Sequence, residues 1–387
     1  MRRKLRWAAA AVAAGAAIVL TAAPAPAQAA SGWRIERVFG RSDFLYLQAI
    51  AASGANNAWL LGLVPDPEPT FVTQRWNGSR WVPIALPARL RNVIGPWALF
   101  SGIYTTSPGD TWFFPVLPDG LTPVQYSLRW NGSAWTISKV SARPDTVLGA
   151  AVFGANDVWA FGEAGSSLPG YGPAVVRHWN GTAWRTVSVP VGTPVTIDGV
   201  APADIWALGV SQATVHRVHQ VIVAMHWNGT AWSAPRLPAF PPVRRGYPWV
   251  ATAISAAGPR DAWVVETPAV NQRTGFSPPG LILLHWDGST WRAVAENRTL
   301  HGVTGLTPDG HGGFWLTATD PANPNAGDIL DYRRGTFTSK PAPALHSYTG
   351  TASGIVAVPG TGSFWATGML TPVKVGASET DILGYIQ

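Results

Sequence analysis

Short apolar runs alternate with turn-forming residues along most of the chain, and two tryptophan-containing tags recur within this pattern. The first tag is a pair of tryptophans around an Asn-Gly or Asp-Gly step: RWNGSRW at 75–81, RWNGSAW at 129–135, HWNGTAW at 178–184, HWNGTAW at 226–232 and HWDGSTW at 285–291. The second tag precedes it: NAWLLG from Asn57, DTWFFP from Asp110, DVWAFG from Asp157, DIWALG from Asp204 and DAWVVE from Asp261. A recurrence about every fifty residues predicts a repeat architecture.

The tryptophan pair has the pattern of a β-hairpin. Asn-Gly between apolar residues favours a two-residue type I′ turn, because both central residues then need positive φ. With Asn77 and Gly78 as the loop, Trp76 would lie opposite Ser79, and Trp76 and Trp81 would project from the same face of the sheet. Five such hairpins predict sheets that are stacked face to face.

The second tag has the pattern of a strand that follows a tight turn. Gly154–Asp157 is turn-like, Val158–Phe161 alternates as a strand does, and a short apolar strand comes before the turn, at Val147–Phe153 in this copy and Ile197–Val200 in the next. One repeat therefore consists of two strands joined by a tight turn, a longer loop, and two strands joined by the Asn-Gly turn. Four antiparallel strands per repeat are typical of a β-propeller blade.

The tryptophans of the second tag give the number of blades. There are seven: Trp59, Trp112, Trp159, Trp206, Trp263, Trp315 and Trp365. The sixth hairpin, Tyr332–Phe337, is a degenerate copy in which tyrosine and phenylalanine stand in place of the two tryptophans. The seventh copy ends with a third strand at Ile382–Gln387. Ser31–Ile35 matches the second half of a hairpin and supplies the missing strand. We expect blade repeats at roughly 44–86, 97–140, 147–189, 195–237, 249–296, 301–340 and 350–387 plus 31–38.

The predicted fold is therefore an all-β, seven-bladed β-propeller of four-stranded antiparallel blades, closed by the N-terminal strand, which completes the last blade. The DVWAFG…HWNGTAW pattern resembles the secreted tryptophan-rich β-propeller repeat proteins of actinobacteria, over residues 31–387. The hairpin is similar to the Asp-box of sialidase-like propellers, although only Asp287 keeps an aspartate there. Members of the repeat family are mostly of unassigned function, so the resemblance implies a fold and little about activity.

The first 29 residues have the pattern of a secretory signal peptide. Their basic residues are Arg2, Arg3, Lys4 and Arg6, followed by the apolar run Ala8–Leu20 and the small-x-small sequence Ala27-Gln28-Ala29. We expect a signal peptide at 1–29, a single propeller domain at 30–387 and a secreted, extracellular protein. The pattern favours general secretion and leaves twin-arginine export open.

Removal of the leader lowers the formal net charge from +7 to +3, because the leader holds four basic residues and no acidic one. A domain this close to neutral has no basic field for nucleic acid. The sequence contains no second long apolar run, so it does not predict insertion into a membrane. The absence of cysteine excludes disulfides, thiolate metal sites and a cysteine nucleophile. We expect no metal, no cofactor and a monomer.

Several recurrent polar residues are best explained by the scaffold. The aspartates at 110, 157, 204 and 261 occur once per blade, and we expect each to accept bonds from backbone amides of its turn. The position before the hairpin tryptophan holds His178, His226, His285, Arg75, Arg129 or Asp331, which predicts a surface column with a structural or solvent-facing role. The Asn-Gly-Ser/Thr sequons are interpreted as turns.

Two tryptophans fall outside the repeat. Trp97 and Trp249 each follow a proline and lie near arginines, and exposed aromatics beside arginines suit sugar or aromatic ligands. The candidate ligand-binding residues are Trp97, Trp249, Tyr247, Arg91, Arg244 and Arg245. Packing of the two tryptophans against a neighbouring blade is the alternative.

No spacing assembles a catalytic constellation, so the catalytic residues stay unassigned. A sialidase-like set would draw on the arginines and tyrosine above with Glu163 and Glu266, and a His–Glu pair would join His216 or His219 to Glu266. We expect a binding or interaction module for an extracellular glycan, a cell-wall polymer or a protein partner. It would act on the long-loop face, the side of the ring that carries the loops between the second and third strands and those between blades. The alternatives are a carbohydrate-active hydrolase or lyase on that face and a structural envelope protein without a small ligand.

Overall fold

The computed structural model divides the chain into two units, Met1–Ser31 and Gly32–Gln387. It describes residues 33–39, 46–64, 70–90, 102–119, 122–143, 145–165, 172–211, 221–270, 276–309, 311–320, 323–341, 348–372 and 380–386. Among these residues, no helix has the length and apolar character that crossing a membrane requires. The one helix of the described segments is a short 3₁₀ turn, η1 (Ala88–Leu90).

The strands of the Gly32–Gln387 unit form seven antiparallel sheets, which we number as blades in chain order. The first four blades are β2 (Tyr46–Gly54), β3 (Asn57–Val64), β4 (Thr70–Trp76) and β5 (Trp81–Ile84); β6 (Ile103–Ser107), β7 (Asp110–Phe113), β8 (Val116–Asp119), β9 (Thr122–Trp130) and β10 (Trp135–Lys139); β11 (Thr146–Gly154), β12 (Asp157–Glu163), β13 (Ala174–Trp179) and β14 (Trp184–Val187); and β15 (Val191–Ala201), β16 (Asp204–Ser211), β17 (Ile222–Trp227) and β18 (Trp232–Ser233).

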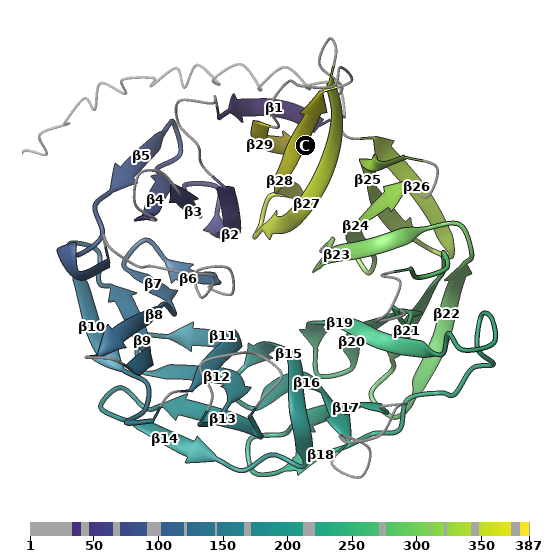
Figure 1. Ribbon diagram of the computed structural model, residues 1–387, viewed down its shortest axis with the longest axis horizontal. Coiled ribbons are helices and arrows are strands. Elements are labelled where there is room, and N and C mark those ends of the chain that lie inside the picture. The colour runs from purple at the N-terminus through teal and green to yellow at the C-terminus, as the bar shows by residue number, and fades with distance from the viewer. Residues whose placement is uncertain are drawn as a thin grey trace, which may run out of the picture. The chain divides into compact units, whose positions relative to one another are not determined.

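The last three blades are β19 (Trp249–Gly258), β20 (Asp261–Pro268), β21 (Leu281–Trp286) and β22 (Trp291–Asn297); β23 (His301–Pro308), β24 (Phe314–Asp320), β25 (Asn323–Arg333) and β26 (Thr336–Pro341); and β27 (Tyr348–Val358), β28 (Ser363–Pro372), β29 (Thr380–Ile386) and β1 (Trp33–Val38). The first strand of each blade contacts the first strand of the next, and β27 contacts β2, so the blades form a closed ring (Figure 1). The fold is an all-β propeller with four-stranded antiparallel blades. The second blade carries the additional strand β8.

The N-terminal strand β1 completes the seventh blade. It pairs antiparallel with β29, with Trp33 opposite Ile386 and Ile35 opposite Gly384. Sequence-distant ends of the unit therefore share one sheet, as the match between Ser31–Ile35 and the hairpins predicts. This pairing covers an edge of β29 that would otherwise present unpaired backbone groups.

The repeat tryptophans pack between blades. The second-tag tryptophan of one blade contacts the hairpin pair of the next: Trp59 lies 5.9 and 5.7 Å from Trp130 and Trp135, and Trp206 lies 5.3 and 5.2 Å from Trp286 and Trp291. The same contact joins Trp365 of the seventh blade to Trp76 and Trp81 of the first. Edge-to-face aromatic pairs add about 1 kcal/mol each to the burial of their area.

The prediction of a two-residue type I′ turn at each Asn-Gly step is wrong. Trp76 pairs with Trp81, not Ser79, so the loop has four residues, 77–80. The Asn77 side-chain oxygen accepts hydrogen bonds from the backbone amides of Ser79 and Arg80, and only Gly78 has positive φ. The hydrogen bonds to the asparagine side chain stabilise a turn that needs only one residue with positive φ, where a type I′ turn needs two. The two tryptophans still share one face, because directly opposed residues do.

The type I′ geometry occurs instead in the degenerate sixth hairpin. Arg333 pairs with Thr336, which leaves a two-residue loop of Arg334 and Gly335 with φ of 47° and 86°. The tight turn is therefore found in a hairpin without the Asn-Gly step.

The expected role of the recurrent aspartates is also wrong. In the third blade, Asp157 Oδ1 accepts a hydrogen bond from the Trp159 indole at 2.8 Å and lies 2.9 Å from His178 Nε2. The His178 ring in turn stacks on Trp159 at 4.3 Å. The position before the hairpin tryptophan therefore has the structural role that was one of its two expected roles, because its histidine covers the buried indole and contacts the aspartate. Asp204 contacts His226 and Asp261 contacts His285 in the same way, and Asp110 forms an ion pair with Arg129.

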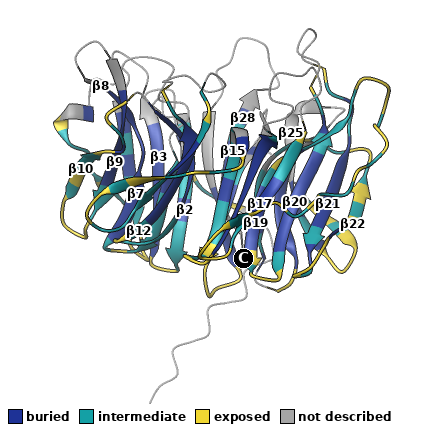
Figure 2. Ribbon diagram, turned by 90° about the horizontal axis from the view of Figure 1, so that it is seen from below, coloured by how far each residue is buried: buried dark blue, intermediate teal, exposed yellow. Residues whose placement is uncertain are grey.

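The turns divide between two faces of the ring, and Figure 2 shows the strands running from one to the other. The Trp76 indole donates to the carbonyl of Ala55, so the hairpin lies beside the short turn between the blade's first two strands. We call the side that carries both kinds of short turn the hairpin face. Strand polarity then places the connections between blades, and those between the second and third strands, on the opposite side, which we call the connection face.

Candidate functional site

The join between the fourth and fifth blades is a long segment that the structure describes throughout. Residues 234–248 connect β18 to β19, whereas the two other joins that the structure describes throughout span 188–190 and 298–300. This segment, which we call the 234–248 connection, contains five prolines, three arginines and no acidic residue. Prolines fix φ and lower the entropy cost of holding one conformation, so the segment suits a preformed binding surface.

A pocket of about 460 Å³ opens between this connection and the neighbouring strands. Its lining joins the start of β17, the start of β19 and the end of β20, which all lie towards the connection face. The residues that line it include Val221, Leu237, Phe240, Pro248, Trp249 and Glu266. We call it the Glu266 pocket. Its volume is in the range of small-ligand sites.

Trp249 is half-buried at the edge of this pocket. Its indole N–H donates to the carbonyl of Pro241 at 3.0 Å, which ties the connection to β19. A Cβ added at Gly280 would meet the far edge of the indole at 2.7 Å, so the ring rests directly on glycine. Trp249 also packs against the hydrophobic cluster between the fourth and fifth blades. The packing alternative drawn from the sequence is therefore confirmed for Trp249, and its role in ligand binding stays a prediction.

Glu266 supplies the pocket's carboxyl group. The residue is 6% exposed, and no hydrogen bond or ion pair to its carboxyl occurs within the described residues. Burial raises the pKa of Glu266 from its ordinary value of 4.5 to about 7, because desolvation penalises the charged form. Near neutral pH the group can therefore donate as an acid or accept as a carboxylate.

Arg244 and Tyr247 form a tight turn just before the pocket. They are joined by a β-bridge, and the Arg244 guanidinium lies 5.9 Å from the centre of the Tyr247 ring. Phe276, 47% exposed, contacts the other edge of Tyr247 at 5.9 Å. Arg245 is exposed beside them. The turn thus presents aromatic rings and guanidinium groups next to Trp249.

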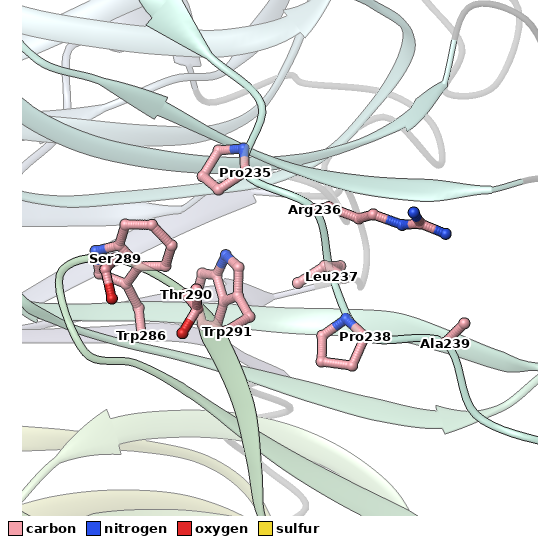
Figure 3. A pocket seen from close by; sticks show the side chains of 9 residues that line it. All are labelled: Pro235, Arg236, Leu237, Pro238, Ala239, Trp286, Ser289, Thr290 and Trp291. Carbon is pink, nitrogen blue, oxygen red and sulfur yellow. The ribbon is translucent and has the colours of Figure 1, made fainter.

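A second pocket of about 490 Å³ lies on the other side of the connection, towards the hairpin face. Figure 3 shows Trp286 and Trp291 facing the segment from Pro235 to Ala239, which lines both pockets. The indole N–H of Trp291 has no hydrogen-bond partner, but the same is true of Trp81, Trp135 and Trp232 in other blades. That recurrence marks the unpaired indole as a feature of the scaffold.

The structure brings part of the predicted site together. Trp249, Tyr247, Arg244 and Arg245 lie on or beside one connection, with Glu266 in the pocket below them. Trp97, Arg91, His216 and His219 lie outside the described residues, so the second predicted cluster and the His–Glu pair have no described geometry. Sequence reasoning missed Arg236, Leu237 and Phe240, although the length and the proline and arginine content of the segment mark it out.

The structure describes only part of the sialidase-like set, because Arg91 lies outside the described residues. Glu163 ends β12 in the third blade, where its carboxylate accepts a hydrogen bond from Gly172 N at 2.9 Å. Glu266 is in the fifth blade, so the two carboxyl groups belong to separate sheets. Within the described segments, no group of three or more histidine and acidic side chains has an arrangement that could hold a metal ion.

Comparison with known proteins supports the fold. No family model matches the chain, and no curated protein matches it. Among solved structures it is similar to YCF48 from Cyanidioschyzon merolae, at 13% identity and a TM-score of 0.54, over 92% of this chain and 99% of that chain. It is also similar to an ulvan lyase, a polysaccharide lyase, at 11% identity and a TM-score of 0.54, over 90% and 95%.

A third solved structure, the fucose-specific lectin from Aleuria aurantia, matches at 12% identity and a TM-score of 0.45, over 80% of this chain and 99% of that chain. The first two likenesses, at their low identity, establish the fold alone. The third has too low a TM-score to support any argument about this chain.

Proposed function

We propose that this chain is a secreted carbohydrate-binding propeller and that the Glu266 pocket is its binding site. The observation that carries the proposal is a preformed cavity that combines an indole, proline and aliphatic walls with one carboxyl group that has no partner among the described residues. Sugar rings present apolar faces that pack on an indole, and hydroxyl groups that bond a carboxyl group. Secretion is supported by the leader-like first 29 residues, and membership of the tryptophan-rich repeat family by the two tags.

A screen of the mature protein on a glycan array tests the proposal. We expect a glycan signal that Trp249→Ala weakens about tenfold, because the stacking surface is lost. Trp97→Ala is screened beside it, since Trp97 is the other tryptophan outside the repeat.

Because Trp249 also packs on the core, a second variant leaves the core intact. Ala239 is exposed and lines the pocket, so Ala239→Gln fills the cavity, whereas Ala231→Gln makes the same change at an exposed hairpin residue. Ala239→Gln is expected to reduce binding and Ala231→Gln to leave it unchanged. An array with no glycan signal, or binding that both glutamine variants retain, would refute this site.

One observation favours catalysis as a second candidate function. A carboxyl group with a pKa near 7 can act as a general acid, as a hydrolase or lyase requires. Incubating the glycan found on the array with the protein, followed by chromatography of the products, tests this. Cleavage that Glu266→Gln abolishes while binding persists would establish an enzyme. Intact glycan after prolonged incubation would rule out catalysis on it.

A further inference from the structure

We infer that the ligand of the Glu266 pocket is an anionic polysaccharide whose carboxylate or sulfate groups are held by Arg236, Arg244 and Arg245. The inference rests on the proposed function and names the class of glycan. It comes from the charge of the 234–248 connection, which no ion pair among the described residues neutralises.

The three arginines are exposed, and none of them forms an ion pair within the described residues. In the blades, by contrast, Arg129 pairs with Asp110 and Arg177 pairs with Asp145. No acidic residue occurs between positions 221 and 249, so the strand and the connection that border the pocket carry a net positive charge. A guanidinium group presents a planar fork that matches carboxylate and sulfate geometry.

The positions of the arginines fit an extended ligand. Arg236 lines both pockets on the connection, and Arg244 is held by its turn with Tyr247, immediately before Trp249. A sugar residue packed on Trp249 would therefore lie beside the connection that carries the three guanidinium groups. The prolines between them reduce the ordering cost of binding.

The surroundings favour a glycan over a nucleic acid, the other common polyanion. Single-stranded nucleic acid is held by several aromatic rings that stack successive bases, together with a long basic groove. The pocket offers one indole, and the chain without its leader has a formal net charge of only +3, because its arginines and acidic residues are equal in number and three lysines remain. Nucleic acid binding is therefore an outcome that would overturn the inference.

The test uses titration calorimetry of the mature protein with four defined polymers. Polygalacturonate carries carboxylates and dextran sulfate carries sulfates, while dextran is neutral and a thymidine oligonucleotide is a non-glycan polyanion. We expect binding to polygalacturonate or dextran sulfate, and the stronger of the two identifies the anion. Binding should weaken as salt is raised from about 50 to 500 mM, because exposed charges are screened.

The triple variant Arg236→Ala, Arg244→Ala and Arg245→Ala should lose about tenfold or more in affinity. The matched control is Arg80→Ala, Arg143→Ala and Arg185→Ala, which removes the same charge at exposed arginines of the first three blades. The control should change affinity less than about twofold, because long-range attraction alone is screened. Equal losses in the two variants would overturn the inference.

The remaining outcomes separate the two proposals. Binding of dextran that depends on Ala239 and not on the arginines would overturn the anionic class and keep the carbohydrate site. Stronger binding of the oligonucleotide than of any glycan would overturn both, as would the absence of binding to all four polymers and to the glycan array.

Discussion

At the scale of single residues, the environment of each carboxyl group determines its role. The recurrent aspartates are paired: Asp204 lies 2.7 Å from His226, whose ring stacks on Trp206. Glu266 has comparable burial and no such partner in the part of the chain that the structure describes. Paired carboxylates therefore stabilise the blades, whereas the unpartnered one reduces stability when ionised and is free to meet a ligand.

The paired aspartates should differ in their effect on stability. The Asp204 side chain is 5% exposed and that of Asp261 is 39% exposed, although both pair with a histidine. We expect Asp204→Ala to lower the free energy of unfolding by about 2 kcal/mol and Asp261→Ala by less, because solvent replaces the lost partner of His285. Urea denaturation curves of the two variants measure this. Equal losses would contradict an ordering by burial.

Glu266 should make stability depend on pH. Its pKa is about 7 in the folded protein against an ordinary 4.5, so below pH 4.5 both states are protonated and nothing is lost. As pH rises to 7 the unfolded chain releases the proton first, which lowers the free energy of unfolding by about 3 kcal/mol. The melting temperature at pH 4.5 and at pH 8 should therefore differ less in Glu266→Gln than in the wild type. An unchanged difference would show that the carboxyl group is not desolvated.

At the scale of the element, the hairpin turn depends on one side-chain oxygen. Asn180 Oδ1 accepts hydrogen bonds from Thr182 N, Thr182 Oγ1 and Ala183 N, and Asp287 makes the same three contacts in the fifth blade. These bonds stabilise the ionised form and lower the pKa of the Asp287 carboxyl below its usual range. Asparagine and aspartate are thus equivalent here at neutral pH.

We expect Asn180→Ala to cost about 1 kcal/mol, because the turn amides lose their acceptor at an exposed site. Asn180→Asp is the matched control and should be tolerated at pH 7, as the fifth blade shows. Chemical denaturation of both variants gives the comparison. A tolerated alanine would mean that Gly181, with φ of 93°, defines the turn unaided.

At the scale of the whole propeller unit, the two ends of the chain meet in one blade. β1 hydrogen-bonds to β29, and Trp365 of that blade packs against the hairpin tryptophans of the first. The ring therefore has no covalent closure, and the seventh blade depends on a strand from the other end of the unit.

Removal of residues 1–39 should lower the melting temperature by about 5 °C or more, because the β29 edge and its neighbours lose a strand. Removal of residues 1–29 alone should leave the melting temperature equal to that of the full chain. Circular dichroism melts test both, and addition of a peptide spanning 31–39 should restore part of the loss. Identical melts of the two truncations would contradict closure by β1.

Most of the fold was predictable because it repeats. The spacing of Trp59 to Trp365 predicted the blades, and the match at Ser31–Ile35 predicted the closing strand. The turn type was not predictable from Asn-Gly alone, because the asparagine side chain competes with the backbone to satisfy the turn. The pairing of aspartates with histidines was missed because it joins strands that are separated by about twenty residues.

The candidate site lies on a connection between two repeats, outside the repeated pattern. Sequence patterns alone could not assemble it. The sequence by itself determined the propeller, its closing strand and the two tryptophans outside the repeat, because periodicity and composition are local properties of the chain. Only the tertiary structure placed Trp249, Glu266 and the 234–248 connection around one pocket. Burial of Glu266 without a partner depends on contacts between separate blades, and no pattern along the chain records those contacts.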